Sequence, residues 1–316
     1  MNRSLRLGAT LILLAVAGGR AEPIRQSDVA ASSPWAAHLD VAKLQHSPLG
    51  GFLVKSAGFD RVVDLQEALK KELALDLGAV ESVTLHGVGE RGIEAVLLVR
   101  GRFQELDLAS FPQAAQPGES AVAIHEGPQW NGQQTYLALR SDTELVGGTS
   151  IRAVRDGLAL LAGQKKSWAE RNLPAKQAGV ISTATAQLAL DMERIGAELG
   201  FEAEFTKSLR RAWLLVGSRE EDVEVTLLLD SVDAESLALV RSQLTLLTAA
   251  LTSGPDTPPE WRALAAAIRV ETDGNWMSAR VSAPPEETTR LLQSLGPLFN
   301  GEANRPVSSE SPDLSR

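Results

Sequence analysis

Apolar residues recur along this chain with two different periods. In two stretches, 83–101 and 213–231, alternating apolar and polar residues flank a short polar turn. A period of two is typical of strands with one buried face, so each stretch predicts a β-hairpin. Residues 35–41 and 179–185 are also strand-like, and each leads into a segment with helical periodicity.

Apolar residues three and four positions apart predict helices between these strands. The best-defined stripe consists of Leu237, Val240, Leu244, Leu247 and Leu251. Asp233 precedes it at the position of an N-cap. Comparable stripes cover 62–73, 150–161 and 188–199, and a short helix is predicted at 260–266. Ser150 and Gly163 have the residue types of an N-cap and a helix end.

Two dipeptides predict tight hairpin turns. Asn131-Gly132 lies between strand-like runs at 124–130 and 133–139, and Asp273-Gly274 lies between runs at 267–272 and 275–281. Asn-Gly and Asp-Gly tolerate the positive φ that a type I′ turn requires at both central positions. We therefore expect a two-residue turn at each dipeptide.

The two hairpin stretches resemble each other when one is shifted by 130 residues. The matched positions include Leu85 with Leu215, Gly87 with Gly217, Glu90 with Glu220, and Glu94 with Glu224. This internal similarity predicts an α+β protein of two similar halves, each an antiparallel sheet covered by helices in a split β-α-β-β-α-β-like layout. The predicted organisation is a signal peptide at 1–21, a first repeat at 22–162, a basic linker at 163–177, a second repeat at 178–301 and a disordered tail at 302–316.

The first 21 residues have the pattern of a secretory signal. Arg3 and Arg6 precede an apolar segment at 7–17, and Gly19-Arg20-Ala21 provides a small-x-small cleavage site. The apolar segment is too short to span a bilayer as a helix, although an uncleaved N-terminal anchor is the alternative. We expect an exported protein, periplasmic or extracellular, with no stable membrane span.

Composition and charge exclude several classes of protein. The chain has 316 residues and no cysteine, which removes disulfides, thiolate nucleophiles and cysteine-ligated metals. Its net charge is −9, and loss of the predicted signal with its three arginines makes it −12. Because nucleic-acid binding depends on neutralising phosphates, we expect no nucleic-acid partner. The local basic charge at 163–177 favours a solvated linker over a docking site for an acidic partner.

Residues 81–89 and 96–103 carry a family resemblance. They read ESVTLHGVG and VLLVRGRF, and they resemble a motif in secreted bacterial proteins of unknown function whose strand-rich halves are repeated behind a signal peptide. The resemblance covers about a third of the chain, and in the second repeat residues 231–233 (SVD) replace 101–103 (GRF). It implies a duplicated α+β layout and no particular activity.

Motifs for cofactors and metals are weak. Residues 87–92 match G-x-G-x-x-G, but a dinucleotide site needs a helix after the glycines, and a strand is predicted there. No pair of histidines has the spacing that places two metal ligands on one helix face. His38 and Asp40 share one strand face, and His86 lies on a neighbouring predicted strand. A His38–Asp40–His86 cluster is therefore a hypothesis for a base or a metal site, against ordinary surface or half-buried histidines. We assign no cofactor and no metal.

The internal similarity singles out two further pairs. Glu94 and Glu224 occupy equivalent strand positions, and two carboxylates flanking a cleft could serve a glycoside hydrolase, although solvated strand positions explain them as well. Trp130 and Trp276 flank the two predicted turns. If exposed, their indoles could hold a sugar or a peptide, with packing at the sheet edge as the alternative.

No motif in the sequence organises catalysis, so we assign no catalytic residues. We therefore expect a non-enzymatic binding or assembly protein of the bacterial envelope, with a protein or glycan partner. The alternative is a carboxylate-dependent hydrolase acting in a cleft between the two repeats. A third possibility is a structural protein that self-associates through exposed hairpin edges. Clustered carboxylates with perturbed pKa values would favour the hydrolase, an exposed apolar patch would favour binding, and uncovered edge strands would favour self-association.

Overall fold

The computed structural model describes residues 24–55, 77–88, 94–115, 122–129, 132–170, 173–195, 207–255, 257–288 and 290. The predicted signal peptide, the predicted tail and the whole helical stripe at 62–73 lie outside these ranges. The strands are β1 (Trp35–Asp40), β2 (Val80–Val88), β3 (Glu94–Gly101), β4 (Gln113–Ala115), β5 (Ile124–Glu126), β6 (Tyr136–Ser141), β7 (Glu144–Gly148), β8 (Ala186–Asp191), β9 (Leu209–Arg219), β10 (Asp222–Ser231), β11 (Arg269–Asp273) and β12 (Trp276–Ala283). The α-helices are α2 (Val41–Gln45), α3 (Pro48–Lys55), α5 (Ile151–Leu161), α6 (Ala175–Thr183), α7 (Met192–Ile195), α9 (Ala234–Ser253) and α10 (Pro259–Ala267). Short 3-10 helices are η1 (Gln26–Asp28), η3 (Leu77–Ala79), η4 (Leu108–Ser110) and η5 (Trp168–Glu170).

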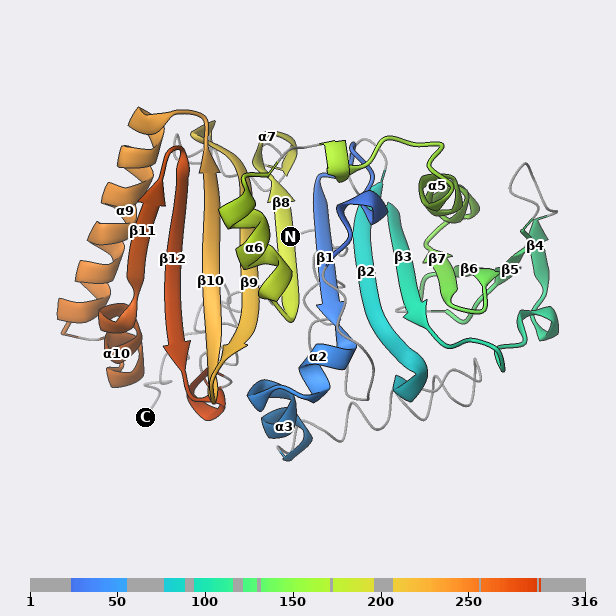
Figure 1. Cartoon of the computed structure of the whole chain (residues 1–316), viewed down its shortest axis with the longest axis horizontal. Helices are drawn as coiled ribbons and strands as arrows, with labels where there is room; N and C mark the ends of the chain where they lie inside the picture. Colours follow the sequence, from blue (N-terminus) through green and yellow to red (C-terminus); the bar gives the residue numbers. More distant parts are fainter. Residues whose placement is uncertain are drawn as a thin grey trace, which may run out of the picture.

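All the described strands belong to one sheet, whose order is β11-β12-β10-β9-β8-β1-β2-β3-β7-β6-β5-β4 (Figure 1). Neighbouring strands are antiparallel throughout. At the centre β1 pairs with β8, with Trp35 opposite Leu190 and Leu39 opposite Ala186. The predicted α+β class is confirmed as an antiparallel sheet with helices. The chain order strand, helix, strand, strand, helix, strand occurs from β8 to β11, while in space β8, β9 and β10 are successive neighbours and β12 lies between β10 and β11.

The hairpins predicted at 83–101 and 213–231 are confirmed as β2–β3 and β9–β10. Strand β3 follows the glycines at 87–92, as a hairpin turn requires and a dinucleotide loop does not. In the second hairpin Arg219 lies opposite Asp222, which leaves a two-residue turn. The first turn residue, Glu220, has a φ of 57°, a conformation that residues with a side chain adopt rarely.

The prediction of a strand at 179–185 is wrong. Helix α6 occupies most of it, and the strand that opens this part of the chain is β8, which overlaps the stretch predicted as a helix at 188–199. Of that stretch, α7 is helical and residues 196–199 lie outside the described ranges. Strand β8 is covered on both faces, so its apolar residues do not alternate with polar ones. Periodicity alone does not distinguish such a strand from a buried helix.

One predicted tight turn differs from expectation, and the other, Asn131-Gly132, includes a residue outside the described ranges. Asp273 lies opposite Trp276, so the central turn residues are Gly274 and Asn275 rather than Asp273-Gly274. Gly274 has a φ of 58° and Asn275 has a negative φ, which fits a type II′ turn and not a type I′ turn. In the other hairpin the described pairing of β5 with β6 ends with Glu126 opposite Tyr136. A one-residue shift in strand pairing is enough to replace the turn type.

The helix ends follow the sequence closely. Ser150 and Asp233 cap α5 and α9, because their side chains accept hydrogen bonds from the amides of Ala153 and Ser236. Gly163 has a φ of 71° directly after α5, and its N–H donates to the Leu160 carbonyl while the next amide donates to the Ala159 carbonyl. This pair of hydrogen bonds is the Schellman arrangement that left-handed glycines permit at a helix end.

Both faces of the sheet are covered at its centre, and β1 is buried along its whole length. The histidine face carries His38 and His86 and is covered by α5, α6, η1 and η5. The opposite face, the α9 face, carries Leu39 and Met277 and is covered by α2 and α9. Figure 1 shows α6 lying over β9 and α9 standing at the end of the sheet beside β11. The chain therefore forms a three-layer arrangement of helices, sheet and helices.

No helix in the described ranges combines the length and the apolar character needed to cross a membrane.

Candidate functional site

The tryptophan pair predicted to bind a ligand is not an exposed pair. Trp276 is only 8% exposed, and its ring packs against Trp213 with 5.4 Å between centroids. Trp130 lies outside the described residues. At Trp276 the structure therefore shows a packed indole, which fits the alternative of packing in the sheet. Its strand register places it on the covered histidine face, where α6 packs.

The structure instead places an arginine against both buried indoles. The guanidinium carbon of Arg211 lies 5.4 Å from the ring of Trp213 and 5.6 Å from the ring of Trp276. Asp230 accepts from Nε and Nη2 of Arg211 at 2.9 and 2.6 Å. The buried carboxylate fixes the guanidinium, which adds a cation–π attraction to each ring. Arg211, Asp230 and Trp276 lie opposite one another on β9, β10 and β12.

Sequence reasoning missed this cluster. Arg211 and Trp213 are two residues apart on a predicted strand, which places them on one face and was a usable signal. Their contact with Trp276 depends on the register of β10 against β12, and this register cannot be predicted from the sequence.

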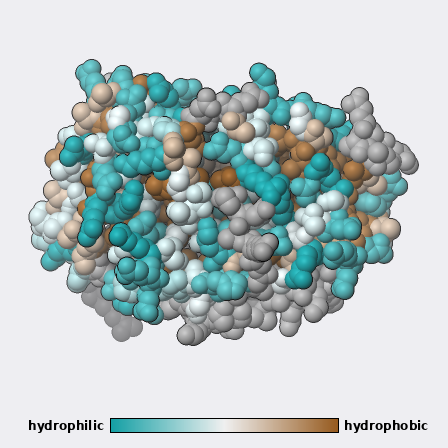
Figure 2. Space-filling view, in the orientation of Figure 1, coloured by the Kyte–Doolittle hydropathy of each residue, from teal (hydrophilic) through white to brown (hydrophobic). Residues whose placement is uncertain are grey.

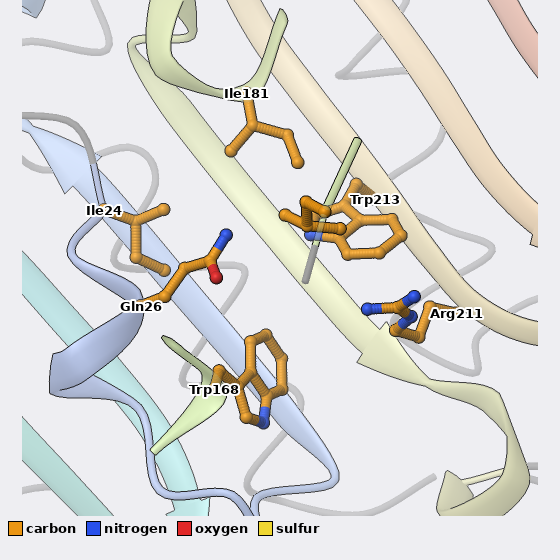
Figure 3. A pocket seen from close by; sticks show the side chains of 7 residues that line it. Ile24, Gln26, Trp168, Ile181, Arg211 and Trp213 are labelled. Carbon is orange, nitrogen blue, oxygen red and sulfur yellow. The ribbon is translucent and has the colours of Figure 1, made fainter. Parts of the chain in front are cut away.

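A hollow lies beside this cluster (Figure 3). Its lining consists of Ile24, Gln26, Trp168, Leu173, Ile181, Arg211 and Trp213. Its cavity volume is about 20 Å³, room for roughly one water molecule and far below the volume of ligand pockets. Arg211 and Gln26 provide the polar groups among the apolar walls. Asp230 already binds two guanidinium nitrogens of Arg211, so this arginine is held by the core of the protein.

The lining of the hollow includes part of the predicted linker. Trp168 is buried, and its amide donates to the Val29 carbonyl at 2.9 Å. The Lys166 carbonyl accepts from the amide of Ala31 at 2.9 Å. Lys165 is paired with Asp156 at 2.6 Å. This segment packs on the histidine face through Trp168, while Lys165, Lys166 and Lys176 are exposed.

The predicted polar cluster is brought to one face, but its members have separate partners. His38 lies opposite Thr84, and its Nδ1 is 2.8 Å from the Thr84 hydroxyl. The Nδ1 of His86 is 2.9 Å from the Ser33 hydroxyl. Asp40 caps α2 by accepting from the amide of Lys43 at 2.7 Å. All three predicted residues are buried, which fits structural roles in the core.

Burial lowers the pKa of His86 from 6.5 to about 4. Desolvation of the charged ring is the main cause, and it outweighs a backbone hydrogen bond at Gly87 and the fields of Asp28 and Asp156, which raise the pKa. His86 is therefore a neutral imidazole at pH 7. Such a group serves as a hydrogen-bonding core residue.

The carboxylates of the described residues do not gather into a catalytic pair at the predicted positions. Glu94 is on β3 and Glu224 is on β10, and these strands are five steps apart in the sheet. At ~4.8 Å per step the separation is roughly 24 Å, while glycoside hydrolases hold their two carboxyl groups less than about 10 Å apart. Across the described part of the chain, no three His, Asp or Glu side chains are grouped to hold a metal ion.

The most exposed apolar surface belongs to α9. Leu239, Leu246 and Leu247 are 41%, 68% and 56% exposed, and they are three of the four large apolar side chains that are exposed in the described residues. The predicted stripe is confirmed at Leu237 and Val240, which are buried against the sheet, whereas Leu247 is mostly outside it. In Figure 2 brown residues reach the surface over α5 and, between hydrophilic residues, towards the α9 end.

The two ends of α9 differ in polarity. The carboxylate of Asp233 accepts from the amide of Ser236, and this hydrogen bond lowers the pKa of Asp233 below its usual range. From residue 238 to Ser253, Arg241 is the one charged residue of the helix. A helix at the surface normally turns charged residues outward, so this composition is unusual for a face in water.

Comparison with known proteins gives no family. No protein-family description and no curated protein matches the chain. Three crystal forms of a protein called TP0453 align with it at 11–12% identity. The alignments cover 86–88% of this chain and 97–99% of TP0453, with TM-scores of 0.43 to 0.46. Similarity of this degree does not indicate a shared function.

Proposed function

We propose that this chain is a non-enzymatic binding or assembly protein of the bacterial envelope, and that α9 is the element that contacts its protein partner. The observation that carries the proposal is the exposure of Leu239, Leu246 and Leu247 on one well-capped helix. Clustered exposed apolar side chains on a folded domain are typical of an interaction site.

Helical geometry places these leucines close together on one side of α9. Residues seven apart lie almost directly above each other on a helix, so Leu239 and Leu246 form one stripe. Leu247 lies between that stripe and the buried side marked by Leu237 and Val240. Full burial of a leucine side chain is worth about 1.5–3 kcal/mol, so covering these three partly exposed ones contributes on the order of 1 kcal/mol each. An apolar groove of a partner would accept such a stripe.

A protein partner fits α9 better than a glycan. The helix contains no aromatic residue, and sugars are bound through aromatic faces and dense hydrogen-bonding groups. Trp213 and Trp276, whose rings could have bound a sugar, are buried. The envelope location rests on the signal pattern of residues 1–21, which precedes the described residues.

The test is site-specific cross-linking in the cells that make the protein. A photo-reactive amino acid replaces Leu246, and in a matched control it replaces Arg152, which is exposed on the outer side of α5. We expect light to join the Leu246 variant to one defined envelope protein, identified by mass spectrometry, and to leave the Arg152 variant unlinked. Adding Leu239→Glu to the Leu246 variant should abolish the product while circular dichroism remains unchanged.

Equal labelling at Leu246 and Arg152, or no product at either position, would rule out α9 as the contact surface. A product of two copies of this chain would replace the proposed heterologous partner by self-association.

A further inference from the structure

The outer edge of the sheet at β11 has the features of a pairing surface for a second copy of this chain. We propose that β11 pairs antiparallel with β11 of another molecule around a two-fold axis at Val270. Helix α9 lies beside this edge, but the inference does not depend on what α9 binds. It rests on the hydrogen-bonding direction of β11, on its charges and on its apolar side chains.

The inner partner of β11 fixes which backbone groups point outward. The amide of Ser231 on β10 donates to the carbonyl of Asn275 at 2.9 Å. The residues at 275, 277 and 279 therefore direct their backbone groups to β10, and those at 276, 278 and 280 direct theirs to β11.

By the same alternation, every second residue of β11 faces away from the sheet. Asp273 is opposite Trp276 and bonds inward, as does Glu271 opposite Ser278. Val270 and Thr272 consequently direct their N–H and C=O groups to the open edge. Within the described ranges no backbone hydrogen bond satisfies these groups, and Thr272 is exposed. Helix α9 lies beside this end of the sheet, where Val270 is half-buried in the cluster beneath it and Thr272 is exposed.

The charges on β11 and β12 also favour pairing with a second copy. Arg269 lies opposite Arg280 on the histidine face, so two guanidinium groups share one cross-strand position. Arg280 has a carboxylate 4.0 Å away, that of Glu271. No Asp or Glu of the described residues comes within 4.0 Å of Arg269. Like charges directly opposite each other in a sheet repel, and a carboxylate beside Arg269 would reduce the repulsion between Arg269 and Arg280.

A second copy provides that carboxylate in the proposed register. When Val270 faces Val270 of the other molecule, Arg269 of each copy faces Glu271 of the other. This arrangement makes two equivalent ion pairs on the histidine face. On the opposite face Val270 packs against its counterpart, and Ile268 faces Thr272. Val270 already packs against the apolar cluster beneath α9, so the new contact extends an existing core.

The register one residue away is less favourable. Pairing around Glu271 would place the two Glu271 carboxylates opposite each other, which costs free energy by repulsion. At the other end of the sheet, β4 has three residues and offers a shorter edge. Short edge strands are a usual protection against pairing, and β11, with five residues, lacks that protection.

The natural absence of cysteine makes the register testable with single thiols. Arg269→Cys and Glu271→Cys are purified as separate full-length variants, mixed, and oxidised by air. In the proposed register, position 269 of one variant lies directly opposite position 271 of the other. The two introduced thiols are then held at the short Cα separation that suits a disulfide. The remaining Arg269 and Glu271 still form one ion pair in this mixed dimer.

We expect the mixture to give roughly tenfold more disulfide-linked dimer on a non-reducing gel than either variant alone. Ser110→Cys, at an exposed position near the other end of the sheet, replaces Arg269→Cys in the control mixture and should give little product. Absence of a mixed product would overturn the proposal. Self-linking of Glu271→Cys as strong as in the mixture would also overturn it, because that outcome requires the Glu271-centred register.

A second variant separates pairing from folding. Thr272→Pro removes an outward N–H and leaves the inward bonds of β11 to β12 in place, as edge strands tolerate. Sedimentation of the wild-type chain should show a two-chain species that grows with concentration, and Thr272→Pro should shift it to one chain with an unchanged circular dichroism spectrum. A wild-type chain that sediments as one chain at every concentration would overturn the proposal.

Discussion

Helices α5 and α9 cover opposite faces at opposite ends of the same sheet, and they differ in the residue types that they expose to solvent. Helix α5 buries five of its 11 residues and turns Arg152 and Arg155 outward. Helix α9 buries two of its 20 residues and turns Leu239 and Leu246 outward. Both have a side-chain N-cap, so the difference does not arise at their first turns.

The difference shows how each helix is stabilised. Helix α5 lies so close to the sheet that a Cβ on Gly157 would be 2.8 Å from Val96 and Val146 side-chain atoms. Its place is determined by packing within the chain. Helix α9 packs through its first turns, while its outer leucines contribute little to this fold. Apolar residues that do not stabilise the monomer are available for a partner.

The largest expected contrast comes from deleting one leucine in each helix. Leu158→Ala in α5 removes a side chain that is 2% exposed and should lower the free energy of unfolding by about 3 kcal/mol through lost burial and a cavity. Leu246→Ala in α9 should change it by less than about 0.5 kcal/mol. Urea denaturation measures both. Equal losses would show that the outer side of α9 is packed within the monomer.

Acid should destabilise the α5 side of the molecule through His86. Its folded pKa of about 4 lies below the unfolded value of 6.5, so the unfolded chain binds more protons between these two pH values. Above pH 6.5 the neutral His86 does not reduce the free energy of unfolding. As the pH falls from 6.5 towards 4, the free energy of unfolding decreases by about 3 kcal/mol. Urea titrations at pH 7 and 4.5 should show the loss, and His86→Gln should be far less sensitive to pH over this range. An unchanged pH dependence in that variant would assign acid sensitivity to other groups.

Removing the two N-caps should have a smaller and similar effect on each helix. Ser150→Ala and Asp233→Ala each leave an amide of the first turn without its side-chain acceptor, which should lower the unfolding temperature of both variants by a few degrees. Thermal unfolding of the two variants provides the comparison. A much smaller loss for Asp233→Ala would mean that the first turn of α9 is stabilised mainly by its packing on the sheet.

The smallest effect is expected at the turns of the α9 side. Glu220 and Gly274 open two-residue turns with almost the same φ, 57° and 58°. Glycine adopts this conformation without steric cost, so Glu220→Gly should stabilise the chain by up to about 1 kcal/mol, while Gly274→Ala should destabilise it. Differential scanning calorimetry resolves changes of this size. Destabilisation by Glu220→Gly would point to a stabilising contact of the glutamate side chain.

Local patterns predicted the elements that depend on neighbouring residues. The hairpins β2–β3 and β9–β10, the caps at Ser150 and Asp233 and the glycine at the end of α5 all follow from short-range rules. The same rules were wrong at β8, since a strand covered on both faces has the apolar content of a buried helix. They also misplaced the turn at Gly274 by one residue.

The candidate site was less predictable than the elements. His38, Asp40 and His86 share a face as strand alternation requires, but burial and separate partners make them core residues. The indole of Trp276 and the guanidinium of Arg211 meet because β9, β10 and β12 are adjacent in one register. Contacts between strands far apart in the chain are not encoded in any local period.

The sequence by itself determined the bounds of helices α5 and α9 and the place of hairpins β2–β3 and β9–β10, because caps, turns and periodicity act within a few residues. It also determined the acidic charge and the absence of thiol chemistry. Only the tertiary structure decided that β1 and β8 join the two parts of the chain into one sheet, that Trp213 and Trp276 are buried, and that β11 and the outer leucines of α9 face solvent. These outcomes depend on which surfaces cover each other, and burial is a property of the whole packed chain.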